Sequence, residues 1–297
     1  MKKLLFRLLY CTGVTTLIAW FHRKRVTILC YHGVTERNGR SADDRKGLHV
    51  NRKRFESHLT FLQRHYHVIS LEEYLRARKT GSSLPDRSVV LTFDDGFRNF
   101  FTTAAPMLAA RKMPATVFLI TDITGRENGN KRGKNWTPLD DKRHLSWTEA
   151  KQLRHRGFEF GSHTCSHSRL LTLSPVETER ELLHSFNDLV TNLGLEQPTL
   201  SYPKGEYSSL LAADARKLGY ACAVTTDHGA NLLNQDRFSL GRTMIGNNDD
   251  KASFAVRVSG TRWYLVKIAS WLGWRSPRRQ VSEKAIEGAQ RGLRLSD

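Results

Sequence analysis

The sequence has few cysteines and no long hydrophobic run. The first argues against a disulfide-rich or zinc-knot protein, and the second against a confident membrane-spanning helix. Its four cysteines include no Cys-x-x-Cys pair, so we expect neither a disulfide framework nor a structural zinc knot. The uncharged run near the amino terminus, residues 8–21, is shorter than the ~20 residues of a confident membrane span. Recognition helices, zinc-finger spacings and aromatic platforms for bases are also missing, which argues against a nucleic-acid partner.

Acidic residues are scarce as well. The chain has 47 Lys+Arg against 29 Asp+Glu, which gives a formal net charge of +18. A charge of this size favours an anionic partner, and we expect an anionic membrane surface rather than a nucleic acid. Hydrophobic residues make up 39% of the 297 positions, which is typical of a globular protein.

Both ends of the chain have the composition of membrane-surface segments. The basic cluster His22-Arg23-Lys24-Arg25 follows residues 8–21 directly, with no small-residue cleavage site between them. Residues 262–275 combine three Trp and one Tyr with aliphatic and basic side chains, as in a helix that lies among lipid headgroups. Core-packing helices are the alternative for both segments. We expect a membrane-associated protein, peripheral or N-terminally anchored, on either side of the membrane.

The middle of the chain alternates short apolar strands with amphipathic helices. Strands are predicted over residues 26–31, 88–93, 115–120, 158–162, 199–202 and 221–226. Helices are predicted over residues 52–65, 71–78, 97–111, 147–156, 175–193 and 208–218. This alternation indicates an α/β fold with a parallel sheet, either open or closed into a barrel.

Polar side chains follow several of these strands where each one ends. His32 follows the first strand, Asp94 and Asp95 follow the second, His163 follows the fourth and His228 follows the last. Because ligands bind at the carboxyl ends of parallel strands, we expect these residues to border one site.

The paired carboxylates and two histidines have the pattern of a metal site. Adjacent carboxylates repel each other unless a metal ion or a shared proton offsets the repulsion, and Gly96 allows the sharp turn that points both into one space. His163 and His167 are four residues apart, which predicts that they share one face of a helical turn. With Asp95 they make an Asp-His-His site for a divalent metal. A helix cap at Asp94 and surface histidines are the simpler alternative.

An open metal site lowers the pKa of its bound water to near ~7. Asp94, beside the ligand Asp95, is then the expected general base. We expect a backbone N–H near Tyr202 to hold the oxyanion and a histidine on the opposite side to protonate the leaving group. Together these parts predict metal-assisted hydrolysis of an amide or ester.

Three segments, in this order, resemble the first three motifs of the polysaccharide deacetylases, carbohydrate esterase family 4 with its NodB-homology domain. They are Thr92-Phe93-Asp94-Asp95-Gly96, His163-x-x-x-His167 and Ser201-Tyr202-Pro203-Lys204-Gly205. The resemblance implies a distorted (β/α)7-type barrel with flanking N- and C-terminal helices. It also implies one divalent metal, Zn²⁺ first and Co²⁺ or Ni²⁺ as alternatives, held by Asp95, His163 and His167, with Asp94 as the base. The implied reaction removes N-acetyl groups from an N-acetylhexosamine polysaccharide or a lipid-linked saccharide, so the partner is an amino-sugar glycan or glycolipid.

On this resemblance we divide the chain into three parts. Residues 1–25 are an anchor-like segment, residues 26–250 are the deacetylase catalytic domain, and residues 251–297 are an amphipathic helix with a basic and polar tail.

The chain departs from the family pattern at the third motif. That motif often begins with an Arg that pairs with the base, but Ser201 stands there, and Arg242 is the predicted replacement. Tyr-Pro-x-Gly is similar to the branch that deacetylates poly-β-1,6-N-acetylglucosamine, where the general acid comes from a strand ending in Tyr-His. Tyr31-His32 matches that strand end, so His32 is the expected acid and His228 its competitor. The altered motif leaves open a catalytically impaired glycan-binding protein, and a metal amidohydrolase of small amides is a further alternative.

Overall fold

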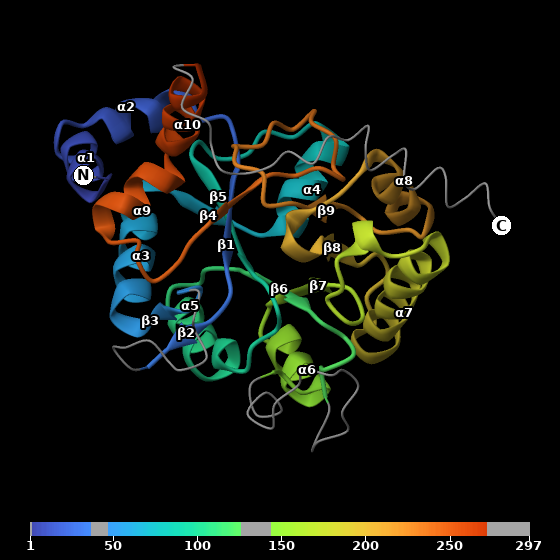
Figure 1. The fold of residues 1–297 in the computed structure, drawn as a ribbon. Helices are drawn as coiled ribbons and strands as arrows, with labels where there is room; N and C mark the ends of the chain where they lie inside the picture. Colours follow the sequence, from blue (N-terminus) through green and yellow to red (C-terminus); the bar gives the residue numbers. More distant parts are fainter. Residues whose placement is uncertain (1, 37–46, 126–143, 272–297) are drawn as a thin grey trace.

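The computed structural model describes residues 2–36, 47–125 and 144–271. A curved parallel sheet forms its centre, with helices packed around the outside (Figure 1). The main path of this sheet follows the order β10-β1-β5-β6-β7-β8-β9. The strands are β1 Thr27–Tyr31, β5 Ser88–Phe93, β6 Thr116–Leu119, β7 Glu159–Ser162, β8 Thr199–Ser201, β9 Ala223–Val224 and β10 Arg242–Met244.

The residues just before β10 bring the two edges of the sheet together. Leu240 N–H donates to the Ala223 carbonyl at 3.1 Å, and Thr225 N–H donates to the Leu240 carbonyl at 2.8 Å. On its other side β10 pairs in parallel with β1, with Ile28 opposite Arg242. The sheet is therefore a nearly closed barrel, and the predicted (β/α)7-type barrel is confirmed.

The barrel is irregular between β5 and β6. A short strand, β4 (His67–Ile69), pairs with the first half of β5. β6 pairs only with Thr92 and Phe93, at the carboxyl end of β5. The Glu159 carboxylate lies beside this seam. It accepts hydrogen bonds from Leu71 N–H at 3.1 Å, in the first turn of α4 (Leu71–Thr80), and from Thr116 Oγ1 at 2.6 Å. The distortion thus comes from two strands that share one edge of β5.

The helices follow the predicted alternation closely. Those between strands are α3 Arg52–His65, α4, α5 Ala105–Ala109, α6 Trp147–His155, α7 Pro175–Leu193 and α8 Ser209–Lys217. A wider π-type turn, Phe100–Ala104, precedes α5, so the predicted helix over 97–111 is shorter and less regular. A separate two-stranded sheet joins β2 (Val34–Thr35) to β3 (Val50–Asn51).

Apolar side chains cover both faces of the strands, so the sheet lies between two apolar layers. Every residue of β1 and β5 is buried. Leu29, Phe55 and Leu91 belong to the large cluster that lies between the sheet and the surrounding helices. Val90 and Phe118 belong to a second apolar cluster, on the other face of the strands. The polar site residues stand further along this inward face.

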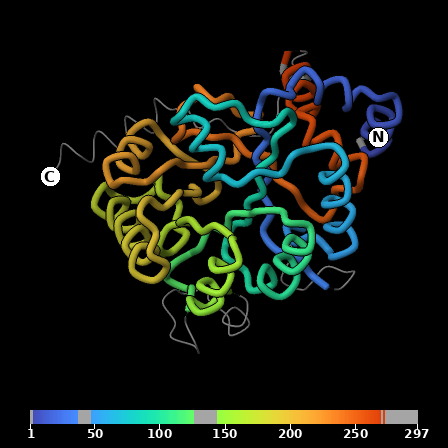
Figure 2. Tube along the Cα trace, turned by 180° about the vertical axis from the view of Figure 1, so that it is seen from behind, coloured from blue at the N-terminus to red at the C-terminus, as the bar shows by residue number. Residues whose placement is uncertain are grey.

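Helices from both ends of the chain lie together at one corner of the molecule (Figures 1 and 2). They are α1 Lys2–Cys11, α2 Val14–Phe21, α9 Lys251–Val258 and α10 Thr261–Trp271. The axes of α1 and α2 differ by 73°, with Gly13 at a φ of 76° between them. Among the described residues no single helix is long and apolar enough to cross a membrane. The bent pair of α1 and α2, taken together, meets the length and composition of a span and no more than that. The end of the predicted segment 262–275 and the polar tail lie outside the described residues.

Candidate active site

The inward face of β5 leads directly into the site. Side chains alternate along a strand, so Val90, Thr92 and Asp94 point the same way, and this series changes from apolar to charged. Asp94 is buried, with 3% of its surface exposed. Asp95 and Gly96 have φ angles of 71° and 65°, and these two left-handed residues turn the chain. Both carboxylates therefore reach one space, as predicted.

The two histidines meet without a helix. His163 directly follows β7, and the residues up to His167 form an irregular bend, so the predicted helical turn is wrong. Thr164 and His167 have φ angles of 64° and 62°, and His167 N–H donates to Thr164 Oγ1 at 3.1 Å. This bridge folds the loop back and brings the imidazole centroids to 4.7 Å. A left-handed β-branched residue is strained, which is common where a site imposes the conformation.

Asp95, His163 and His167 present a compact set of metal-binding atoms. Asp95 Oδ1 lies 3.4 Å from His163 Nε2 and 3.7 Å from His167 Nε2, and one ligand atom from each residue falls within 4.8 Å of the others. Among the described residues Asp95 Oδ1 has no hydrogen-bond partner although it is buried. A buried carboxylate oxygen without a partner is costly, and a cation between these atoms would offset that cost.

The orientation of His163 also suits metal binding. Its Nδ1 lies 2.8 Å from the Ser201 carbonyl oxygen. A carbonyl only accepts, so Nδ1 carries a hydrogen, and Nε2 is the ring nitrogen that faces Asp95 and would bind a metal. Fixing the second ring nitrogen in this way is the usual support for a metal-bound histidine. The donor set, one carboxylate and two imidazoles, fits a divalent transition metal such as zinc.

Arg242 forms a bidentate ion pair with Asp94, as the sequence predicted. Its two terminal nitrogens donate to Asp94 Oδ1 and Oδ2, each at 2.7 Å. The remaining three N–H groups donate to Thr92 Oγ1 at 3.2 Å, Ser201 Oγ at 2.9 Å and the Thr225 carbonyl at 2.9 Å. Arg242 is fully buried, and all five of its donors are used. The guanidinium is therefore held rigidly against the carboxylate.

The charges of the site keep both carboxylates ionised. Burial would raise the pKa of Asp94, but the Arg242 guanidinium and then His163 outweigh it and hold this pKa well below its usual range. Burial of Asp95 is likewise outweighed by its contact with His163 and by nearby His32, so its pKa is also lowered. Burial and then the charge of His163 lower the pKa of His167 to about 4. Two anions and two imidazoles beside a single guanidinium favour the addition of a cation.

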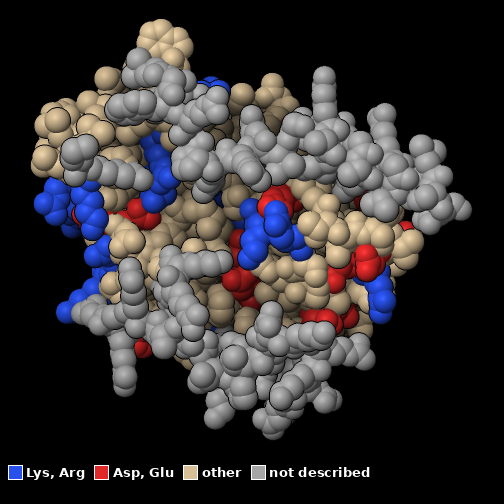
Figure 3. Space-filling view, in the orientation of Figure 1, with Lys and Arg blue, Asp and Glu red and all other residues tan. Residues whose placement is uncertain are grey.

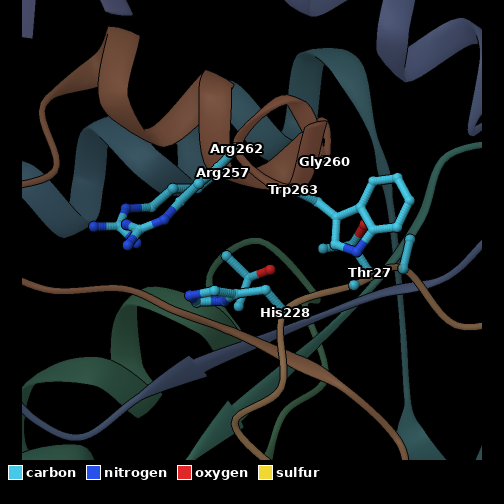
Figure 4. A pocket seen from close by; sticks show the side chains of 9 residues that line it. Thr27, His228, Arg257, Gly260, Arg262 and Trp263 are labelled. Carbon is cyan, nitrogen blue, oxygen red and sulfur yellow. The ribbon is translucent and has the colours of Figure 1, made fainter. Parts of the chain in front are cut away.

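His32 lies at the site and His228 does not. His32 follows β1, is 9% exposed, and acts electrostatically on both Asp94 and Asp95. Its Nδ1 is buried and has no hydrogen-bond partner among the described residues. His228 instead faces a pocket lined by Thr27 and Trp263 (Figure 4), where the chain turns back toward the amino end of β1. The structure thus separates the two candidate acids.

The backbone N–H of Tyr202 is not available for the predicted role of oxyanion donor. Its N–H donates to the Val224 carbonyl at 3.2 Å in the sheet, and its hydroxyl donates to the Phe238 carbonyl at 3.2 Å. This N–H is therefore engaged, and it is not the free oxyanion donor that the sequence suggested. Pro203 has no N–H, so the next amide along the chain belongs to Lys204, which has a φ of 61°.

The supporting contacts of several residues could not be predicted from the sequence. Thr92 and Ser201 both accept hydrogen bonds from Arg242, and Ser201 Oγ also lies 3.4 Å from each Asp94 oxygen. Asn99 Oδ1 accepts from Val34 N–H at 3.2 Å and so steadies the loop that carries His32. Only the inward alternation along β5 could have pointed to Thr92.

Comparison with known sequences shows which proteins the chain resembles. Residues 81–223 match the sequence profile of the polysaccharide deacetylases, and this range contains Asp94, Asp95, His163 and His167. Over these residues the chain is similar to the polysaccharide deacetylases. The profile does not reach His32 or Arg242, and the structure places both residues near Asp94.

Individual relatives match most of the chain. YxkH of Bacillus subtilis, named as a candidate polysaccharide deacetylase, is 27% identical over 249 residues, 82% of this chain and 81% of that protein. A poly-β-1,6-N-acetyl-D-glucosamine N-deacetylase of Staphylococcus aureus is 28% identical over 218 residues, 70% of this chain and 71% of that protein. The solved structure of the Streptococcus pyogenes deacetylase PplD in complex with acetate is 26% identical, with a TM-score of 0.67 over 79% of this chain and 98% of that one.

Proposed function

We propose that this protein removes N-acetyl groups from an amino-sugar polymer with the help of one divalent metal, zinc before cobalt or nickel. The observation that carries the proposal is the buried Asp95 Oδ1, which lies without a hydrogen-bond partner between two imidazole nitrogens, next to the ionised Asp94. The Staphylococcus aureus relative acts on poly-β-1,6-N-acetyl-D-glucosamine by its name, so this polymer is the first substrate to test. Acetate in the PplD structure is the product that such a reaction releases.

Asp95, His163 and His167 would hold the metal, which when bound supplies a more acidic water and polarises the substrate carbonyl. Asp94 accepts the proton of the attacking water, and the Arg242 guanidinium holds its carboxylate in place and ionised. The Lys204 N–H is our proposed donor to the developing oxyanion, because the Tyr202 N–H is engaged in the sheet.

His32 is the proposed general acid. It lies close enough to act electrostatically on both aspartates, and its Nδ1 has no hydrogen-bond partner among the described residues. Its imidazole is therefore available to pass a proton to the departing amine nitrogen of the sugar, which completes cleavage of the C–N bond.

The alternative of an impaired glycan-binding protein rested on Ser201 in place of an arginine. Arg242 now fills that role from another strand, and the Ser201 hydroxyl accepts one of its hydrogen bonds at 2.9 Å. The altered motif is thus compensated rather than incomplete. No observation favours a small-amide hydrolase over a glycan deacetylase.

Acetate release from β-1,6-linked N-acetylglucosamine oligomers by the full chain tests the proposal. We expect release that a chelator abolishes and zinc restores, that Asp94→Asn reduces by at least about 100-fold, and that Asp236→Asn, a surface control, leaves unchanged. Metal content measured on Asp94→Asn should equal that of the parent, because Asp94 is not a ligand. Bound metal without acetate release from any N-acetylated glycan would overturn the proposal and support the binding protein.

A further inference from the structure

The corner formed by the terminal helices exposes large apolar side chains. We call this surface the terminal-helix face, and six residues define it: Leu4, Leu8, Leu17, Phe21, Ile268 and Trp271. Leu4 and Leu8 are 73% and 58% exposed on α1, and Leu17 and Phe21 are 57% and 64% exposed on α2. Each pair is spaced by four residues and so shares one side of its helix. Exposed apolar side chains gathered in this way usually mark a contact surface.

The opposite sides of the same helices are fixed to the protein. Phe6 of α1 and Ala19 of α2 are 5% and 6% exposed. His22 Nε2, just after α2, lies 2.7 Å from the Tyr264 hydroxyl of α10, and the two rings stack. These contacts hold α1 and α2 against the body of the protein, with an angle of 73° between the two helices. The outward sides of both helices are therefore free to lie on a surface.

The charge of these segments is of one sign. Residues 2–25 contain six Lys or Arg, residues 251–271 contain four, and neither range contains an Asp or Glu. Asp86 pairs with Arg23 and Lys24 at 3.4 and 2.7 Å. Asp249 pairs with Arg257 at 2.5 Å, so part of this charge is neutralised. In Figure 3 the corner over α1 and α2 is mainly tan, with blue Lys and Arg side chains along its border. Apolar side chains bordered by cations complement a layer of anionic lipid headgroups.

We propose that the terminal-helix face docks the protein in the plane of an anionic phospholipid bilayer. Leu8, Phe21 and Trp271 enter the boundary between headgroups and acyl chains, and the basic residues meet the phosphates. The bent and anchored geometry of α1 and α2 favours lying on the membrane over crossing it. This inference does not depend on the deacetylase reaction.

Sedimentation of the full chain with vesicles tests the docking. We expect binding to vesicles with about 30% phosphatidylglycerol, weaker binding to pure phosphatidylcholine, and loss of binding as salt rises from about 0.05 M to about 0.5 M. Leu8→Asp with Leu17→Asp should weaken binding at least about tenfold. The matched control is Val176→Asp on α7, which alters a 68% exposed apolar residue outside the face and should bind like the parent.

Several results would overturn the proposal. One is equal binding by the Leu8/Leu17 variant and the parent, with unfolding midpoints that show both to be folded. Another is a parent dimer in solution that the same two substitutions dissociate, since the face would then join two copies. Binding that appears only after removal of residues 272–297 would show that this tail covers the face. Resistance of the bound protein to alkaline extraction would show a spanning segment instead.

Discussion

Replacement of Arg242 by leucine is the sharpest test of how the site is built. Arg242 is fully buried and its partner Asp94 is 3% exposed, so the substitution leaves an ionised carboxylate without its guanidinium in the core. Removing one partner of a buried ion pair costs about 3–5 kcal/mol. That loss is large beside a total stability of about 5–15 kcal/mol, and it corresponds to a fall in the unfolding midpoint on the order of 10 °C.

A second substitution separates lost charge compensation from lost packing. Asp94→Asn in the Arg242→Leu background removes the stranded charge, so we expect the double variant to recover at least about 2 kcal/mol of the loss. Arg242→Lys keeps one charge but loses the fork of hydrogen bonds, and should fall between the parent and Arg242→Leu. The matched control is Arg216→Leu, which breaks an exposed pair with Asp236 and should cost less than about 1 kcal/mol.

Thermal unfolding followed by circular dichroism measures all five proteins. A cost below about 1 kcal/mol for Arg242→Leu, or no recovery on adding Asp94→Asn, would refute the view that Arg242 compensates the charge of Asp94.

Three further predictions follow from other parts of the structure. Burial lowers the pKa of His58 to about 4. The pKa of His58 in the unfolded chain is about 6.5, so its contribution to the free energy of unfolding is complete above about pH 6.5. That contribution is lost as the pH falls toward about 4, by up to about 3 kcal/mol. The free energy of unfolding of His58→Phe should not show this loss over the same pH range. Gly205→Ala should destabilise the third motif by more than about 2 kcal/mol in urea unfolding, because a Cβ there would lie 2.4 Å from Thr226 N and the φ is 72°. His32→Gln should lower kcat for acetate release at least about 100-fold, while His228→Gln stays within about threefold; the reverse order would make His228 the acid.

Long, strongly patterned elements could be predicted from the sequence. The run of β5 was located to the residue because the five apolar or β-branched side chains after Ser88 fit a strand covered on both faces. The bounds of α7 also match, because Ser174 and Glu177 form a capping box and Gly194 ends the helix. The metal-binding set was found through its residue types and their position after strands.

What the sequence did not reveal depends on neighbours that are far apart in the chain. β4 and β10 have three residues each, and a strand that short exists only because the adjacent strands pair with it. Thr164 is β-branched, so its left-handed conformation could not be expected, and a helical turn was predicted in its place. Whether the Tyr202 N–H is free depends on its register with Val224, which local pattern does not determine.

The position of Arg242 on β10 links the site to the order of protein synthesis. β10 is the last strand of the barrel to leave the ribosome, and it pairs with β1, the first, through Ile28 and Arg242. Until that strand arrives, Asp94 and Asp95 lack the guanidinium that balances them, and the ring of strands is open. Closure of the barrel and neutralisation of the Asp94 carboxylate therefore occur together, late in folding. Both depend on pairing between residues more than two hundred positions apart. We expect a chain that terminates before this strand to lack both the barrel and the working base, so incomplete products of translation carry no deacetylase site.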